Sequence, residues 1–156
     1  MQIHLIAVGE RMPGWVQTGF EEYARRLPHG CRLVLREIAP GRRGKNADIA
    51  RAIRDEADRI EAALPASCCL VALDVQGRAM STEALAGRLD DWLQGGRDVA
   101  LLVGGPDGLH PELLARAELR WSLSALTFPH PLVRVILAEQ IYRAWSVLTN
   151  HPYHRA

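Results

Sequence analysis

Two short, almost entirely apolar runs constrain the fold of this chain more than any other feature. They are Cys69–Asp74 (CLVALD) and Asp98–Val103 (DVALLV). Strands of a parallel sheet are covered on both faces, so they have continuous apolar runs rather than alternating ones. We therefore expect a sheet with helices on both sides, and these two runs as its central strands.

The rest of the chain alternates between strand-like and helix-like patterns. Short β-prone segments at Gln2–Val8, Cys31–Ile38 and Leu119–Leu123 predict three further strands. Amphipathic or capped segments between the strands predict helices at about Pro13–Leu27, Ala47–Leu64, Ser81–Gly95 and Pro111–Ala117. This order predicts an α/β fold with a mostly parallel sheet flanked by helices.

Length and composition fit one domain over residues 1–156, with 48% hydrophobic and 24% charged residues. In open parallel sheets, ligands bind beyond the carboxyl ends of the strands. Here those ends are Leu73-Asp74, Val103-Gly104-Gly105 and Leu123-Ser124. We expect a ligand site where these three segments meet.

The segment Leu132–Thr149 predicts a helix that is apolar around more than half of its circumference. A surface helix needs only an apolar stripe, so this one should be covered twice, by the sheet and by a second copy of the protein. Its polar residues Glu139, Arg143, Ser146 and Asn150 share one face and lead into His151–Arg155.

Several classes of protein are disfavoured. No run approaches a membrane span, and no basic leader is present, so we expect a cytoplasmic protein without membrane contact. Three cysteines without a CxxC pair indicate buried thiols. His151 and His154 alone fall short of a metal site, so no metal is expected.

A basic loop lies between the second strand and its helix, with the sequence GRRGKN at residues 41–46. Arg42, Arg43 and Lys45 among glycines could follow a phosphate backbone and so bind RNA. A solvated surface loop is an equally good interpretation, because the net charge of the chain is only +1.

The run GGPDG at residues 104–108 follows a buried strand without opening a helix. It therefore lacks the GxGxxG arrangement of a dinucleotide site. Its glycines permit a tight turn and close backbone contact with a flat ligand such as adenine, or they serve a simple turn.

Taken together, five segments carry a resemblance to a known family: IAVGERMPGWVQTGFEEY, GRRGKNADI, LVALDVQG, DVALLVGGPDGL and WSLSALTFPHPLVRVILAEQIYRAWSVLTNHPYHR. Over its full length the chain resembles the ribosomal RNA large subunit methyltransferase H family of the SPOUT class. The resemblance implies a homodimer and a C-terminal trefoil knot, a topology that general folding rules would not have suggested.

The same resemblance implies a reaction and a set of site residues. The reaction is S-adenosylmethionine-dependent methylation of N3 of a pseudouridine in 23S rRNA, on the assembled ribosome. The implied cofactor contacts lie in the loops that follow the strands: Leu73, Gly104, Gly105, Leu123, Ser124, Ala125, Leu126, Thr127 and Phe128.

Because S-adenosylmethionine carries an activated methyl group, neither a metal nor a covalent intermediate is needed. The N3–H must lose its proton, or its developing oxyanion must be stabilised, and His154 is the candidate base. Tyr153 would contact the target base, Arg155 would hold RNA, and Arg143 and Glu139 would orient the tail. The alternative is a non-catalytic ribosome-binding or RNA-binding factor that uses the basic loop and the tail.

Overall fold

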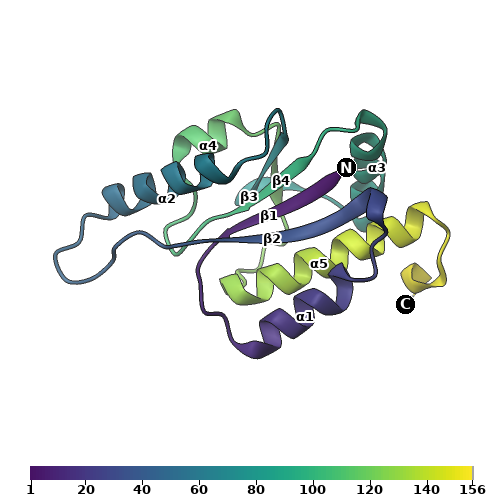
Figure 1. Ribbon diagram of the computed structural model, residues 1–156, viewed down its shortest axis with the longest axis horizontal. Helices are drawn as coiled ribbons and strands as arrows, with labels where there is room; N and C mark the ends of the chain where they lie inside the picture. The colour runs from purple at the N-terminus through teal and green to yellow at the C-terminus, as the bar shows by residue number, and fades with distance from the viewer. Residues whose placement is uncertain (156) are drawn as a thin grey trace.

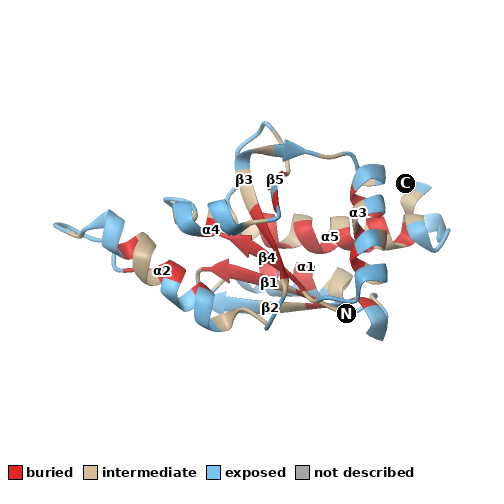
Figure 2. Cartoon of the chain, turned by 90° about the horizontal axis from the view of Figure 1, so that it is seen from above, coloured by how far each residue is buried: buried red, intermediate tan, exposed pale blue. Residues whose placement is uncertain are grey.

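A computed structural model describes residues 1–155 and contains a five-stranded sheet in which all neighbouring strands are parallel. The strand order is β2-β1-β4-β3-β5 (Figures 1 and 2). The predicted parallel α/β sheet is confirmed. Its strands are β1 (Gln2–Val8), β2 (Arg32–Ile38), β3 (Cys69–Ala79), β4 (Val99–Val103) and β5 (Leu119–Ser122).

Helices cover both faces of the sheet (Figures 1 and 2). On one face, α1 (Gly14–Ala24), α3 (Thr82–Gly95) and α5 (His130–Leu148) share a core with the strands. On the other face, α2 (Ile49–Ala63) and α4 (Pro111–Arg116) form a smaller core. Every residue of β4 is buried, as its continuous apolar run predicted.

The helix ends follow local capping chemistry. Ser81 accepts a hydrogen bond from the Ala84 amide at the start of α3, and Gly96 ends that helix in a left-handed conformation. The predicted helices begin and end within about three residues of the observed ones. Two short 3₁₀ segments, η1 (His29–Cys31) and η2 (Pro152–Arg155), complete the fold.

The predicted end of β3 was wrong. The strand was expected to stop at Asp74, but it continues to Ala79 because it pairs again with β5 after an irregularity between Leu73 and Arg78. Gly77 allows this approach, since a Cβ atom there would lie 2.7 Å from the Arg120 carbonyl carbon. The residues beyond Asp74 therefore belong to the strand and pair again with β5 at Arg78 and Ala79.

The face of α5 away from the sheet is covered differently from the prediction. In addition to the sheet, α5 packs against both α1 and α3. These two helices of the same chain bury part of the apolar surface that was expected to contact a second copy. Ser146, predicted on the polar face, is fully buried and donates to the Arg143 carbonyl at 2.6 Å. The buried surface of α5 therefore does not by itself require a second copy.

The predicted knot is consistent with the course of the C-terminal third. β5 occupies the sheet edge beside β3, and the chain continues into α5, which packs against both α1 and α3. None of the helices within residues 1–155 has the length and hydropathy of a membrane span.

Candidate functional site

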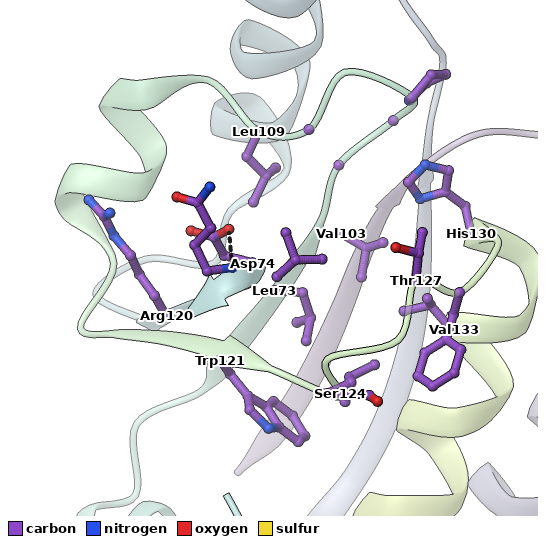
Figure 3. A pocket seen from close by; sticks show the side chains of 18 of the residues that line it. Leu73, Asp74, Val103, Leu109, Arg120, Trp121, Ser124, Thr127, His130 and Val133 are labelled. Carbon is purple, nitrogen blue, oxygen red and sulfur yellow. Dashed lines mark hydrogen bonds between the residues drawn. The ribbon is translucent and has the colours of Figure 1, made fainter. Parts of the chain in front are cut away.

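A cavity of about 560 Å³ lies at the carboxyl ends of β3, β4 and β5 (Figure 3). The three predicted strand ends meet there. The residues expected to bind the ligand line this cavity with one exception, Ala125, which is exposed and outside the lining. Those present are Leu73, Gly104, Gly105, Leu123, Ser124, Leu126, Thr127 and Phe128.

One wall of the cavity is the Gly104–Gly108 segment, called here the pocket turn. The Gly108 amide donates to the Gly105 carbonyl at 3.0 Å, which closes the turn. A Cβ atom at Gly104 would lie 2.5 Å from the Gly108 carbonyl carbon, and Gly108 has a φ of +79°. A side chain is thus excluded at Gly104 by contact and disfavoured at Gly108 by the backbone conformation, so at these two positions the turn faces the cavity with its backbone.

The start of α5 supplies a second wall that sequence reasoning missed. His130 and Val133 both line the cavity, close to Thr127 (Figure 3). Burial lowers the pKa of His130, and the neighbouring Arg134 guanidinium lowers it further, so the ring is neutral at neutral pH. The run Pro129-His130-Pro131 was interpreted only as the start of a helix. Its position directly after Phe128, a predicted cofactor contact, was the signal that it could line the same cavity.

Arg134 is a further residue that the sequence did not reveal. It is 1% exposed, although arginine is rarely buried without partners. Its guanidinium donates to the Glu37 carboxylate at 2.7 Å and to the Gly9 carbonyl at 2.8 Å. These bonds attach the first turn of α5, and hence the His130 wall, to the carboxyl ends of β1 and β2.

The three cations of the basic loop, residues 41–46, have different environments. Arg42 and Lys45 are exposed, as an RNA contact would require. Arg43 instead forms ion pairs with Glu56 of α2 and with Asp107 of the pocket turn, the latter at 2.8 Å. Both carboxylates raise the pKa of Arg43. Arg43 is therefore already paired within the chain, and its contact with RNA stays a prediction.

Glu56 of α2 is buried, although a carboxylate is usually exposed. Glu56 is 2% exposed, whereas Ile49 is 42% exposed. The buried face of α2 consists of Ala52, Glu56, Ala57 and Ile60, and it includes this carboxylate because Arg43 pairs with it.

At the other end of α5, the predicted polar residues hold the C-terminal tail, residues 151–155. The Tyr153 hydroxyl donates to Glu139 Oε2 at 2.7 Å, and Arg143 Nε donates to the same oxygen at 2.9 Å. The Arg143 guanidinium also lies 4.7 Å from the centre of the Tyr153 ring. Burial raises the pKa of Tyr153, and the Glu139 carboxylate raises it further, so the phenol remains a donor.

His154 has a defined tautomer. Its Nδ1 lies within hydrogen-bond distance of the His151 carbonyl oxygen, which can only accept. Nδ1 must therefore carry the proton in the neutral ring, and Nε2 keeps a free lone pair. Arg155 is exposed next to it.

Within one chain, the tail and the cavity are not one site. The cavity lies at the beginning of α5 and the tail at its end (Figure 1). At about 1.5 Å per residue, the 19 residues of α5 separate them by roughly 28 Å.

Comparisons with known proteins match the whole chain. A family described as "Predicted SPOUT methyltransferase" matches residues 1–154. "Ribosomal RNA large subunit methyltransferase H" of Thioalkalivibrio sulfidiphilus is 63% identical over 155 residues, which cover 99% of each protein. The protein of the same name from Alkalilimnicola ehrlichii is 64% identical over 156 residues, the full length of both.

Among solved structures, a probable methylase family protein from Haemophilus influenzae Rd KW20 has a similar fold. Its TM-score is 0.54 at 14% sequence identity, and the match covers 97% of this chain and 69% of that one. This likeness supports the fold assignment alone.

Proposed function

Because this chain belongs to the SPOUT methyltransferase family, and within it to the ribosomal RNA large subunit methyltransferase H family, we propose that it methylates ribosomal RNA with S-adenosylmethionine. More narrowly, the acceptor is N3 of a pseudouridine in 23S rRNA, on the assembled ribosome in the cytoplasm. One observation carries the proposal: the loops that the family resemblance assigns to the cofactor surround a single cavity.

The cavity has the size and lining that this cofactor requires. Its volume of about 560 Å³ falls within the usual range of roughly 300–1,000 Å³ for small-molecule sites. The pocket turn lets a flat ring lie against its backbone, and Leu73, Leu123 and Phe128 supply apolar surface. When bound, S-adenosylmethionine supplies a methyl group activated by its sulfonium charge.

The tail supplies the proton acceptor. The neutral imide nitrogen has no lone pair available for attack, so its proton must leave before or during methyl transfer. His154 accepts it at Nε2, the nitrogen that the His151 carbonyl leaves unprotonated. Tyr153 contacts the target base with its ring, and Arg155 holds phosphate. Glu139 and Arg143 orient the tail.

The site is shared between two copies of the protein. In one chain, roughly 28 Å of helix separates the base from the cavity, too far for direct proton transfer. In a homodimer with antiparallel α5 helices, each tail could complete the partner's cavity. In support, Leu126 in the cavity wall is 69% exposed in the single chain and thus available for contact.

The test is transfer of labelled methyl from S-adenosylmethionine to ribosomes from a strain that lacks the enzyme, with separated subunits alongside. We expect label on one pseudouridine of the large-subunit RNA, and only in assembled ribosomes. Cofactor binding without label would refute the proposed substrate. Ribosome association without cofactor binding would instead indicate a non-catalytic ribosome-binding factor.

A further inference from the structure

Arg43 connects the basic loop, which sequence reasoning assigned to RNA, with the pocket turn. Its guanidinium pairs with Glu56 through both terminal nitrogens, while its Nε donates to Asp107 at 2.8 Å. We propose that Arg43 is a positioning residue for the cofactor cavity. From its place in the basic loop, Arg43 holds the pocket turn in the conformation that binds the cofactor. This inference rests on the proposed function, because it concerns the cofactor of that reaction.

On the loop side, the contacts are tight. The Gly41 amide donates to Glu56 Oε2 at 2.8 Å, and the Gly41 carbonyl accepts from Arg43 Nη1 at 3.3 Å. A Cβ atom at Gly41 would lie 2.4 Å from the Ala52 carbonyl oxygen, so this end of the loop lies directly on α2. Arg43 therefore extends from a fixed base and not from a free loop.

On the turn side, the same carboxylate lies against Gly105. A Cβ atom at Gly105 would be 3.4 Å from each Glu56 oxygen and 3.1 Å from Val8 Cγ1. Asp107, two residues further along the turn, is bound by Arg43 Nε. The turn is thus held at Asp107 by an ion pair and supported at Gly105 by the carboxylate that pairs with the same arginine.

Such restraint matters because the turn is rich in glycine. An unrestrained glycine segment populates many backbone conformations, and a ligand that needs one of them binds more weakly. Holding the turn in advance lowers that cost. Only arginine can make both contacts. A lysine ammonium has the same charge, but it lacks the planar guanidinium whose separate N–H groups reach Glu56 and Asp107 together.

Two variants of the full-length protein separate this role from an RNA contact. Arg43→Lys keeps the charge and loses the fork. Asp107→Asn weakens the bond to the turn while leaving the buried Arg43–Glu56 pair intact, so folding is preserved. Arg97→Lys is the matched control, because Arg97 makes the same kind of fork with Glu118 and neither residue lines the cavity.

We would measure S-adenosylmethionine affinity by calorimetry, then KM and kcat with ribosomes, and ribosome binding across a salt series. Arg43→Lys and Asp107→Asn should each raise the cofactor Kd and KM roughly tenfold, about the effect of one charge-assisted hydrogen bond. Their kcat and the salt dependence of ribosome binding should stay near wild type. Arg97→Lys should change none of these quantities, and Arg42→Gln should weaken ribosome binding and reduce its salt dependence without changing cofactor affinity.

Unchanged cofactor affinity in both variants, with normal binding by the wild-type protein, would overturn this inference alone. A third variant, Arg43→Gln, removes the charge of Arg43. A reduced salt slope in this variant with unchanged cofactor affinity would also overturn the inference, since that pattern belongs to a phosphate contact. Absence of cofactor binding by the wild-type protein would overturn the proposed function and this inference with it.

Discussion

Glu139 determines where the tail lies, because one of its oxygens accepts hydrogen bonds from both Arg143 and Tyr153. Sequence spacing placed Glu139 and Arg143 on one helix face correctly, since side chains four residues apart are neighbours. It could not show that Tyr153 returns to the same carboxylate. That contact depends on the left-handed conformation of Asn150, which turns the chain back after α5.

His154→Ala should lower the rate of methyl transfer by about 10²- to 10⁴-fold, the usual contribution of a general base, with cofactor affinity near wild type. His151→Ala is the control, because it retains the backbone carbonyl that sets the His154 tautomer. Single-turnover methylation and calorimetry measure the two quantities. If cofactor affinity is lost together with the rate, His154 is not acting as the base.

His130 should make the protein less stable in acid. Burial lowers its pKa in the folded state, so below its unfolded pKa of about 6.5 the unfolded chain binds more protons. The free energy of unfolding should therefore decrease as pH falls from 7 toward 5. His130→Gln should show a smaller decrease, measured by urea unfolding at several pH values. Equal slopes in the two proteins would exclude this linkage.

The ion pairs of Arg43 mark the limit of sequence reasoning at the residue scale. Positions 43, 56 and 107 come from a loop, a helix and a turn that meet only in the folded chain. The sequence revealed a cation among glycines, for which a phosphate contact was a sound chemical interpretation. Which carboxylate reaches that cation is a property of tertiary structure.

At the scale of elements, hydrophobic periodicity alone predicted the buried strands and the order in which strands and helices follow one another along the chain. The end of β3 did not, because the apolar pattern stops at Asp74 while backbone pairing with β5 continues to Ala79. Pairing of this kind depends on a partner strand about 45 residues away and on a glycine that allows close approach. Neither leaves a periodic signal.

Gly77→Ala should separate β3 from β5 and destabilise the fold by roughly 1–3 kcal/mol, since the new methyl group meets the backbone of Arg120 and not a movable side chain. Gly87→Ala in α3 is the matched control. No atom lies within 4 Å of a Cβ atom there, so helix propensity should stabilise that variant by up to about 1 kcal/mol. Chemical unfolding measures both; a neutral Gly77→Ala would mean that the strands can move apart freely.

At the scale of the whole molecule, local patterns predicted a parallel sheet with a ligand site at its carboxyl edge, but not the strand order. The placement of β5 beside β3 brings the Leu123–Phe128 loop to the pocket turn. The knot came from family resemblance alone, because no local pattern encodes it. The dimer was inferred both from the resemblance and from the apolar circumference of Leu132–Thr149. One domain over residues 1–156 stays a prediction, and its last residue, Ala156, lies outside the described residues.

Mixing two inactive proteins should restore activity if the site is shared. Gly105→Val would displace the pocket turn that forms one wall of the cavity, because any Cβ atom there meets Val8 and Glu56, while His154→Ala removes the base. Random exchange of subunits makes half of the dimers mixed, each with one intact site, so we expect roughly a quarter of wild-type activity. Methyl transfer after co-refolding measures it, with each protein alone as control; no recovery would place base and cavity in the same chain.

The length of α5 sets the distance between the cavity and the tail of one chain. Arg134 fixes its first turn to the sheet, and Glu139, Arg143 and Tyr153 fix the tail at its last turns. Adding one residue between these two anchors would move the tail by about 1.5 Å and rotate it by roughly 100° about the helix axis. In a shared site, this helix can therefore accept changes of side chain but not changes of length.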